Sequence, residues 1–162
     1  MIIVRRILVP IDFGETSEAA LTYGMEMTRM FAARLHLLHV FEVSTSMQEY
    51  PVAPFVPGVG DSHDQLTRLL SGADQRDLRP VCETRVGAPA NEILGYAQEH
   101  DIDLIVMGTH GREGFERMLL GSVAETVVRK AACPVLTVHN RTRQAVMEPE
   151  HARASWRACA AS

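Results

Sequence analysis

The feature that most constrains the fold of this chain is the alternation of short apolar segments with segments of helical periodicity. The first apolar segment, Arg6–Ile11, is β-branched and continuous, which is typical of a strand buried on both faces, as in a parallel sheet. Further strands are predicted at residues 35–40, 81–86, 104–107 and 134–138. The sequence therefore predicts an α/β fold, a single three-layer, doubly wound domain with a five-stranded parallel sheet.

Helical segments are predicted between these strands. Residues 16–18 (Thr-Ser-Glu) are typical of a helix start, and residues after them recur at spacings of 4, 3 and 4: Ala20, Gly24, Met27 and Phe31. Further helices are predicted over 64–77, around an inner face of Ile93, Leu94 and Ala97, and over 122–130.

The domain is expected to span residues 1–140 of the 162. Residues 44–63 carry three prolines and two glycines and are expected to form a long irregular segment, a kind of loop that is usually functional or mobile. Residues 141–162 show no apolar period and are rich in Arg, Ala and Glu. They are expected to form a polar, flexible C-terminal tail.

Composition and charge exclude several classes of protein. The formal net charge of −4 argues against nucleic-acid binding, which requires a strongly basic face. Three cysteines without CxxC spacing argue against a disulfide framework and a zinc site, and fit a reducing compartment. The apolar runs fall far short of the ~18 residues of a membrane span, and the apolar residues that precede Arg5 and Arg6 are the reverse of a secretory signal. We therefore expect a cytoplasmic protein.

In a doubly wound sheet, ligands bind beyond the carboxyl ends of the strands, where the strand order reverses. Those ends are Asp12, the region of Val40 and the loop that begins at Gly108. That loop is rich in glycine, and Gly121-Ser122 opens the helix that follows it. Glycines let backbone N–H groups approach an anion closely, and a helix N-terminus adds donors and a favourable dipole. Ser122 is expected to cap the helix and to offer its hydroxyl to a phosphate.

The glycines and Ser122 form the pattern Gly108-x2-Gly111-x9-Gly121-Ser122, which resembles the ATP-binding signature of universal stress proteins of the UspA type. The residues around the signature also resemble the sequences of this family, as do the opening residues 7–12 and the closing residues 133–138. The resemblance covers residues 1 to about 140. It implies a Rossmann-like fold, similar to the adenine nucleotide alpha hydrolases, and an adenine nucleotide as ligand.

The resemblance also implies roles for single residues. Asp12 resembles the acidic residue at the base and ribose end of the nucleotide, close to Pro10, and Val40 looks like the position whose backbone reads adenine. Met107 and Gly108 would line the ribose. The phosphates would be held by a third set of residues: Gly111, Gly121, Ser122 and Val123. His110 and Arg112 lie between the glycines and would face the phosphates, and Arg112 would supply the charge of an absent lysine.

Each of these residues also has a purely structural interpretation. Gly108 and Gly121 can serve as a strand terminator and a helix cap, and Asp12 can form a helix cap or an Asx turn. Val40 can be a plain core valine. His110 and Arg112 can be loop residues that face solvent.

Other nucleotide and catalytic motifs are absent from the sequence. No GxGxxG follows the first strand, no Gly-Lys-Ser/Thr is present, and the only lysine is Lys130. There is no GxSxG, no HExxH and no His/Cys spacing that fits zinc. We therefore expect no metal held by protein side chains alone, and Mg²⁺ would arrive with the nucleotide.

Three functions remain open at this point. The first is a stress-response regulator or sensor that binds ATP, ADP or AMP and pairs as a homodimer through residues 135–138, without catalysis. The second is a slow ATPase or autophosphorylating protein, with Ser122 or a nearby threonine as acceptor. The third is an interaction module without nucleotide, against which the intact glycines argue.

Overall fold

A computed structural model describes residues 3–42, 59–109 and 120–139 of the chain. Their elements, in chain order, are β1 (Arg6–Ile11), α1 (Glu15–Phe31), β2 (Arg34–Phe41), α2 (Val59–Arg68), α3 (Gly72–Leu78), β3 (Val81–Val86), α4 (Pro89–Glu99), β4 (Leu104–Gly108), α5 (Ser122–Lys130) and β5 (Val135–Val138).

The five strands form one sheet in the order β3-β2-β1-β4-β5, and every neighbouring pair is parallel. The chain moves outward from β1 through β2 to β3, then crosses back to β4 on the other side of β1. The strand order therefore reverses between β1 and β4, where a doubly wound sheet opens a crevice at its carboxyl edge. The predicted fold class is confirmed.

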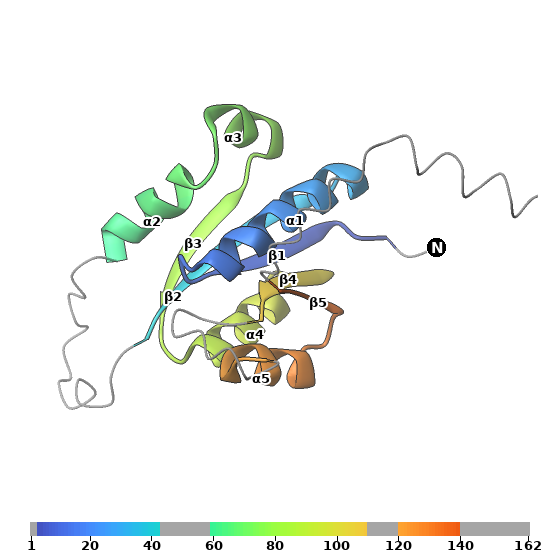
Figure 1. The fold of residues 1–162 in the computed structure, drawn as a ribbon. Coiled ribbons are helices and arrows are strands. Elements are labelled where there is room, and N and C mark those ends of the chain that lie inside the picture. Colours follow the sequence, from blue (N-terminus) through green and yellow to red (C-terminus); the bar gives the residue numbers. More distant parts are fainter. Residues whose placement is uncertain (1–2, 43–58, 110–119, 140–162) are drawn as a thin grey trace, which may run out of the picture.

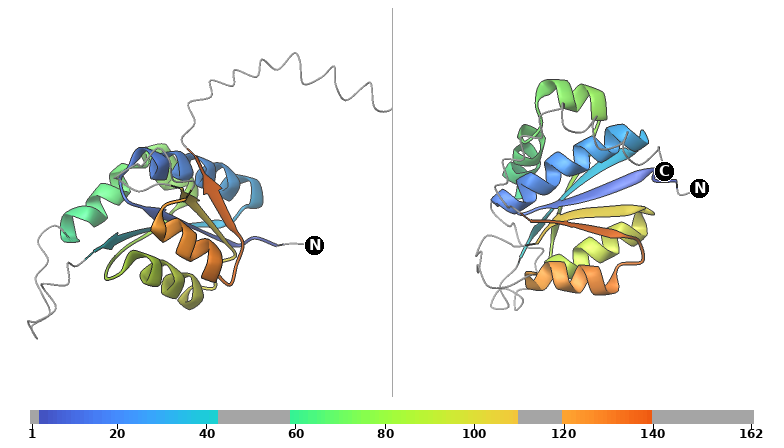
Figure 2. Two further views of the ribbon diagram at one scale, coloured as in Figure 1. Left: turned by 60° about the horizontal axis from the view of Figure 1, so that its bottom comes forward. Right: turned by 45° about the vertical axis from the view of Figure 1, so that its right-hand side comes forward.

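Helices cover both faces of the sheet. Figure 1 shows α1, α2 and α3 on one side and α4 and α5 on the other, and the turned views in Figure 2 show the same layers. Each face of the sheet has its own hydrophobic core, and alternate residues of β1 pack into one or the other. Ile7 and Val9 pack toward α1, whereas Leu8 packs with Leu38 and Ile105 toward α4 and α5. This double burial is the physical reason for the continuous apolar runs.

Two predictions about the segment before β3 are wrong. The helix predicted over 64–77 is two helices, α2 and α3, separated by residues 69–71. The irregular segment predicted over 44–63 is too long, because α2 begins at Val59, and residues 43–58 lie outside the described part of the chain. The break between the helices has a local cause. Ser71 caps the N-terminus of α3, so a new helix begins there and α2 does not continue.

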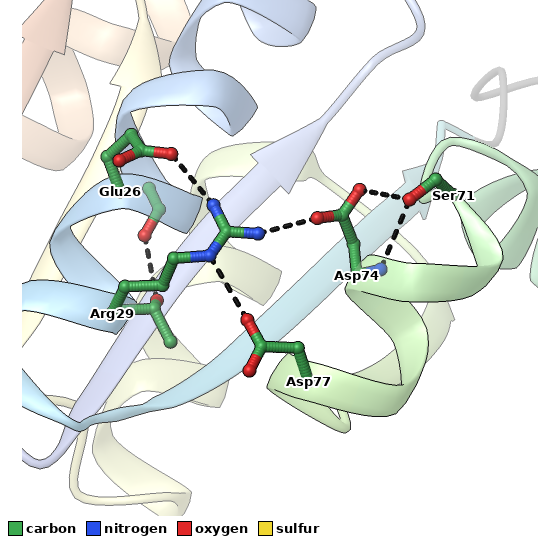
Figure 3. Close-up of polar contacts among 7 residues, drawn as sticks. Glu26, Arg29, Ser71, Asp74 and Asp77 are labelled. Atoms are coloured by element: carbon green, nitrogen blue, oxygen red, sulfur yellow. Dashed lines mark hydrogen bonds and ion pairs between the residues drawn. The ribbon is translucent and has the colours of Figure 1, made fainter.

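Ser71 is the N-cap of α3. Its hydroxyl oxygen lies 3.1 Å from the backbone nitrogen of Asp74, which donates to it, and its hydroxyl donates to the Asp74 carboxylate at 2.5 Å. The same carboxylate group accepts from Arg29 of α1, whose guanidinium also reaches Glu26 and Asp77 (Figure 3). Together these contacts orient the short α3 on α1.

Replacing Ser71 by alanine is expected to lower the free energy of unfolding by about 1 kcal/mol, the usual cost of a lost N-cap. Threonine at the same position keeps the oxygen and should restore most of that loss. Urea denaturation of the two variants measures the difference. Equal losses for alanine and threonine would show that the cap does not stabilise α3.

The described residues contain no helix that is long and apolar enough to cross a membrane. Cys82 and Cys133 are both free thiols, and burial raises the pKa of each. Cys159 and the predicted tail, 141–162, lie outside the described residues.

Candidate functional site

The turn between β1 and α1 forms one wall of the carboxyl edge of the sheet. Asp12 follows β1 directly, and its Oδ1 accepts a hydrogen bond from the Gly14 backbone nitrogen at 2.9 Å. This is an Asx turn, one of the structural roles open to Asp12 from the sequence. Between them, Phe13 has φ of 61°, a left-handed conformation that is uncommon for a bulky residue and is found at turns and functional sites.

A buried histidine supports this turn from β2. The Nδ1 atom of His39 lies 2.7 Å from the Ile11 carbonyl oxygen, and its ring lies 4.7 Å from the ring of Phe13, centroid to centroid. Phe41 packs against the other side of His39 at 4.9 Å. The strained turn is therefore held by an aromatic cluster that reaches across β1 and β2.

The end of β4 lies directly against the start of α1. A Cβ on Gly108 would stand 2.8 Å from the backbone carbonyl carbon of Thr16, closer than real Cβ atoms approach. Only glycine lets the two backbones meet here. The next residue, Thr109, is buried, and its backbone nitrogen donates to the Val138 carbonyl at 3.0 Å.

The start of α5 is tied to the same point. The backbone nitrogen of Gly121 donates to the Thr109 carbonyl at 2.6 Å, which fixes the N-terminus of α5 beside the end of β4. Gly121 is the N-cap, and no side chain in the described part of the chain caps this helix. Ser122 is its first residue and is exposed, so the prediction of Ser122 as N-cap is wrong. Its hydroxyl is not used in capping the helix, whose first N–H groups and dipole favour an anion.

The predicted site residues fall into three groups. One group lies at the carboxyl edge, in the turn after β1, at the end of β4 or at the start of α5: Asp12, Gly108, Gly121, Ser122 and Val123. A second group lies within strands: Pro10 of β1, Val40 of β2 and Met107 of β4. The third group lies outside the described residues: His110, Gly111 and Arg112.

The strand residues differ in what they can offer. Pro10 and Val40 are half-buried, whereas Met107 is 5% exposed and packs in the core beneath α4 and α5. Met107 can therefore offer little besides its backbone. The β1–β2 pairing ends at Ile11 and His39, one residue before Val40, so β1 does not cover that edge of β2 at Val40.

Sequence reasoning missed three polar residues that build this edge, Thr109, His139 and Ser17. The Thr109 hydroxyl lies 2.8 Å from Nδ1 of His139, which joins the ends of β4 and β5. The Ser17 hydroxyl donates to the Gly14 carbonyl at 2.9 Å and closes the first turn of α1. The position of Thr109 inside the glycine-rich segment was the available signal for the first pair.

The described residues hold no group of three or more His, Cys, Asp or Glu side chains in an arrangement that fits a metal ion. Among the described residues, this edge offers backbone donors at α5, the carboxylate of Asp12 and small residues. Such a set suits an anionic ligand that is held mainly by backbone groups.

Comparisons with known proteins identify relatives of the chain. The model of the Usp, or universal stress protein, family matches residues 4–139. Universal stress protein MJ0531 of Methanocaldococcus jannaschii is 36% identical over 148 residues, which cover 83% of this chain and 81% of that protein.

Solved structures are similar as well. The structure of MJ0577, from the same organism, is 28% identical, with a TM-score of 0.63, and the match covers 86% of this chain and 98% of that one. A universal stress protein solved in complex with cAMP is 24% identical, with a TM-score of 0.61, over 85% of this chain and 98% of that one. At that identity the likeness shows the fold alone.

Proposed function

The chain belongs to the universal stress protein family, and on that premise we propose that it binds an adenine nucleotide, ATP foremost, as the ligand of a stress-response regulator or sensor. The nucleotide lies at the carboxyl edge of the sheet, across the point where the strand order reverses. Its phosphates lie at the start of α5 and its base lies toward β2.

The observation that carries this proposal is the attachment of α5 to β4. The 2.6 Å hydrogen bond from Gly121 to Thr109 holds the start of α5 at the reversal of strand order, and no side chain among the described residues caps that start. A phosphate group there would accept from the backbone N–H groups of Ser122 and Val123 and from the Ser122 hydroxyl. No lysine is needed for that contact, and the only lysine of the chain, Lys130, stands in the last turn of α5.

The base and ribose end is supported by β1 and β2. The half-buried Asp12 carboxylate is an acceptor for ribose hydroxyls, although it also serves the Asx turn. The end of the β1–β2 pairing one residue before Val40 supports a role for the Val40 backbone in reading an adenine edge. A known protein of this fold was solved with the adenine nucleotide cAMP, which supports the choice of base.

We further propose that the protein binds its nucleotide without efficient hydrolysis. Among the described residues, the Asp12 carboxylate of the proposed site is engaged by the Gly14 backbone nitrogen and belongs to the proposed ribose end, away from the phosphates. Phosphoryl transfer needs positioned charge around the transferred group, and Mg²⁺ enters this site only with the nucleotide. On this proposal, the protein acts by binding its nucleotide and not by catalysing its hydrolysis.

The proposed assembly is a homodimer through β5. This strand is the outer strand of the sheet beside β4, and Leu136 at its centre is 36% exposed. An apolar edge strand favours pairing with a second copy of itself. In such a dimer the two nucleotide sites lie on one continuous sheet.

A thermal melt with MgATP tests the proposed ligand. At a hundred times its dissociation constant, ATP should stabilise the fold by about 2.7 kcal/mol, which raises Tm by roughly 5–10 °C in a chain of this length. GTP should give a much smaller shift. The variant Gly121→Val, which places a side chain at the α5 N-cap, should give none.

Two outcomes decide against an ATP site. One is an equal shift with ATP in the Gly121→Val variant, which would place the ligand elsewhere. The other is no shift at millimolar ATP in protein whose denatured extract shows no adenine absorbance. A nucleotide in that extract would instead show that the purified protein carries its ligand.

A further inference from the structure

A polar hollow lies at the amino-terminal edge of the sheet, opposite the proposed nucleotide site and beside the end of α4. Its volume is about 350 Å³, and it is lined by Arg6, Arg34, His36, Val81, Glu99, His100 and Asp101. The strand register brings these residues together. Arg6 of β1 pairs with Arg34 of β2. Two residues further along β2, His36 lies between Leu8 of β1 and Val81 of β3. Residues two apart on a strand share a face, so both arginines lie on the face of His36.

His36 is 95% buried, since only 5% of its surface is exposed, and its Nε2 atom has no hydrogen-bond partner in the described part of the chain. Its Nδ1 atom lies 2.9 Å from the hydroxyl of Tyr96, which is fully buried. Among the described residues that hydroxyl makes no other hydrogen bond, so we assign the hydroxyl as the donor and Nδ1 as the acceptor. The ring proton of the neutral imidazole is then on Nε2, which is a buried donor without an acceptor.

Among the described residues, one arginine of the hollow, Arg34, has no carboxylate partner. Arg6 pairs with Asp101 at 3.2 Å and donates to the His100 carbonyl at 2.9 Å. Glu99 pairs with Arg85 at 2.6 Å. Arg34 forms no ion pair and no side-chain hydrogen bond with any residue that the structure describes, although it stands opposite Arg6 on the neighbouring strand. Like charges placed opposite each other are destabilising without a counter-ion.

We propose that this hollow binds a small oxyanion, a phosphate or a carboxylate, between the Arg34 guanidinium and the Nε2–H of His36. The oxyanion supplies the acceptor that His36 lacks and the counter-ion that Arg34 lacks. Burial first, and then the electrostatic effects of His100, Arg34 and Arg6, lower the pKa of His36 to about 4, so at neutral pH the ring donates as a neutral group. Two carboxylates, Glu99 and Asp101, also line the hollow, and each is already paired with another arginine, Arg85 or Arg6.

The site is independent of the proposed nucleotide site. The hollow lies at the amino ends of β1, β2 and β3, whereas the glycines and Asp12 lie at the carboxyl edge. Failure of either proposal leaves the other standing. Their ligands are also read by different groups, since backbone N–H groups dominate at α5 and side chains dominate here.

Side-chain NMR at pH 7 and constant ionic strength tests the proposal, with sodium phosphate and sodium acetate titrated separately against sodium chloride. Long-range ¹H–¹⁵N spectra should show His36 protonated on Nε2. The Nε2 signal should shift saturably with one or both anions, and the two titrations show whether phosphate or carboxylate is preferred. In Arg34→Gln the dissociation constant should rise about tenfold or more, because a charge-assisted hydrogen bond is lost.

The matched control is Arg76→Gln, which removes one exposed arginine of α3 and should leave the dissociation constant unchanged. Thermal melts of both variants confirm that they fold. Three results would each overturn the proposal: a His36 ring protonated on Nδ1, no saturable shift with either anion, or equal binding by Arg34→Gln and the unmutated chain.

Discussion

Replacing Gly108 by alanine lowers the free energy of unfolding by about 3 kcal/mol, a cost at the upper end of the range for overpacked sites. The added methyl would stand 2.8 Å from the Thr16 carbonyl carbon and 2.9 Å from its Cβ. Both atoms belong to the first turn of α1, which cannot move without moving off the sheet. Guanidinium denaturation without nucleotide measures this loss separately from any effect on ligand binding.

Gly95→Ala is the matched control, because it makes the same substitution in the middle of α4. A Cβ there meets only the end of the flexible Glu99 side chain at 3.7 Å, an ordinary contact. Alanine should therefore stabilise the helix by about 0.5–1 kcal/mol. Two Gly-to-Ala changes of opposite sign would show that close approach decides the outcome at Gly108, and a gain at both would contradict that explanation.

The stability of the protein falls as the pH drops from about 6.5 toward 4, and His36 contributes up to about 3 kcal/mol of that fall. The pKa of His36 is about 4 in the fold against 6.5 as its ordinary value, chiefly because burial disfavours the charged ring. A group with a lowered pKa stabilises the fold fully above its unfolded pKa. Each unit of difference is worth about 1.4 kcal/mol, and that contribution is lost as the pH falls to 4.

Urea denaturation at pH 7.0, 6.0, 5.0 and 4.5 measures the slope. His36→Asn retains an amide oxygen near the position of Nδ1, can still accept from Tyr96, and has no titrating ring, so its stability should depend less steeply on pH. His63→Asn alters an exposed histidine of α2 and should keep the slope of the unmutated chain. Parallel slopes for His36→Asn and the unmutated chain would refute the assignment to His36.

The sequence was sufficient for the sheet because double burial leaves a strong local signal. Strands such as Arg6–Ile11 and Leu104–Gly108 are apolar on both faces, and such short continuous apolar runs are typical of strands in a parallel sheet. The sequence did not predict the order of the strands. It predicted that ligands bind beyond their carboxyl ends, at Asp12, the region of Val40 and the loop from Gly108, and the structure adds that the order reverses between β1 and β4.

The helices before β3 show where periodicity misleads. Leu66, Leu69 and Leu70 continue an apolar pattern that favours one long helix, but the pattern does not reveal where backbone hydrogen bonding stops. Ser71 followed three residues later by Asp74 is a start signal for a new helix. The capping signal of Ser71 and Asp74 therefore indicates where α3 begins, which the apolar periodicity does not.

The candidate site could be predicted in its backbone elements and not in its side-chain supports. Gly121 and Asp12 stand at strand and helix ends that the sequence marks. The contact of His39 with Ile11 and Phe13, and the bond from Thr109 to His139, join residues that lie 26 to 30 positions apart. Such pairs depend on register, which no local pattern specifies. The same holds for His36 and Tyr96, which are 60 positions apart.

The central place of β1 has a consequence for how the chain acquires its fold. β1 meets β2 early, since Arg6 pairs with Arg34, but Ile7 pairs with Leu104, which is 97 positions away. During synthesis, one edge of β1 therefore has no partner strand until most of the domain has left the ribosome. Closing so long a chain segment is entropically costly and slow. The β4 crossover is thus the step at which a nascent chain is most exposed to association with other chains, and the step that a chaperone would best protect.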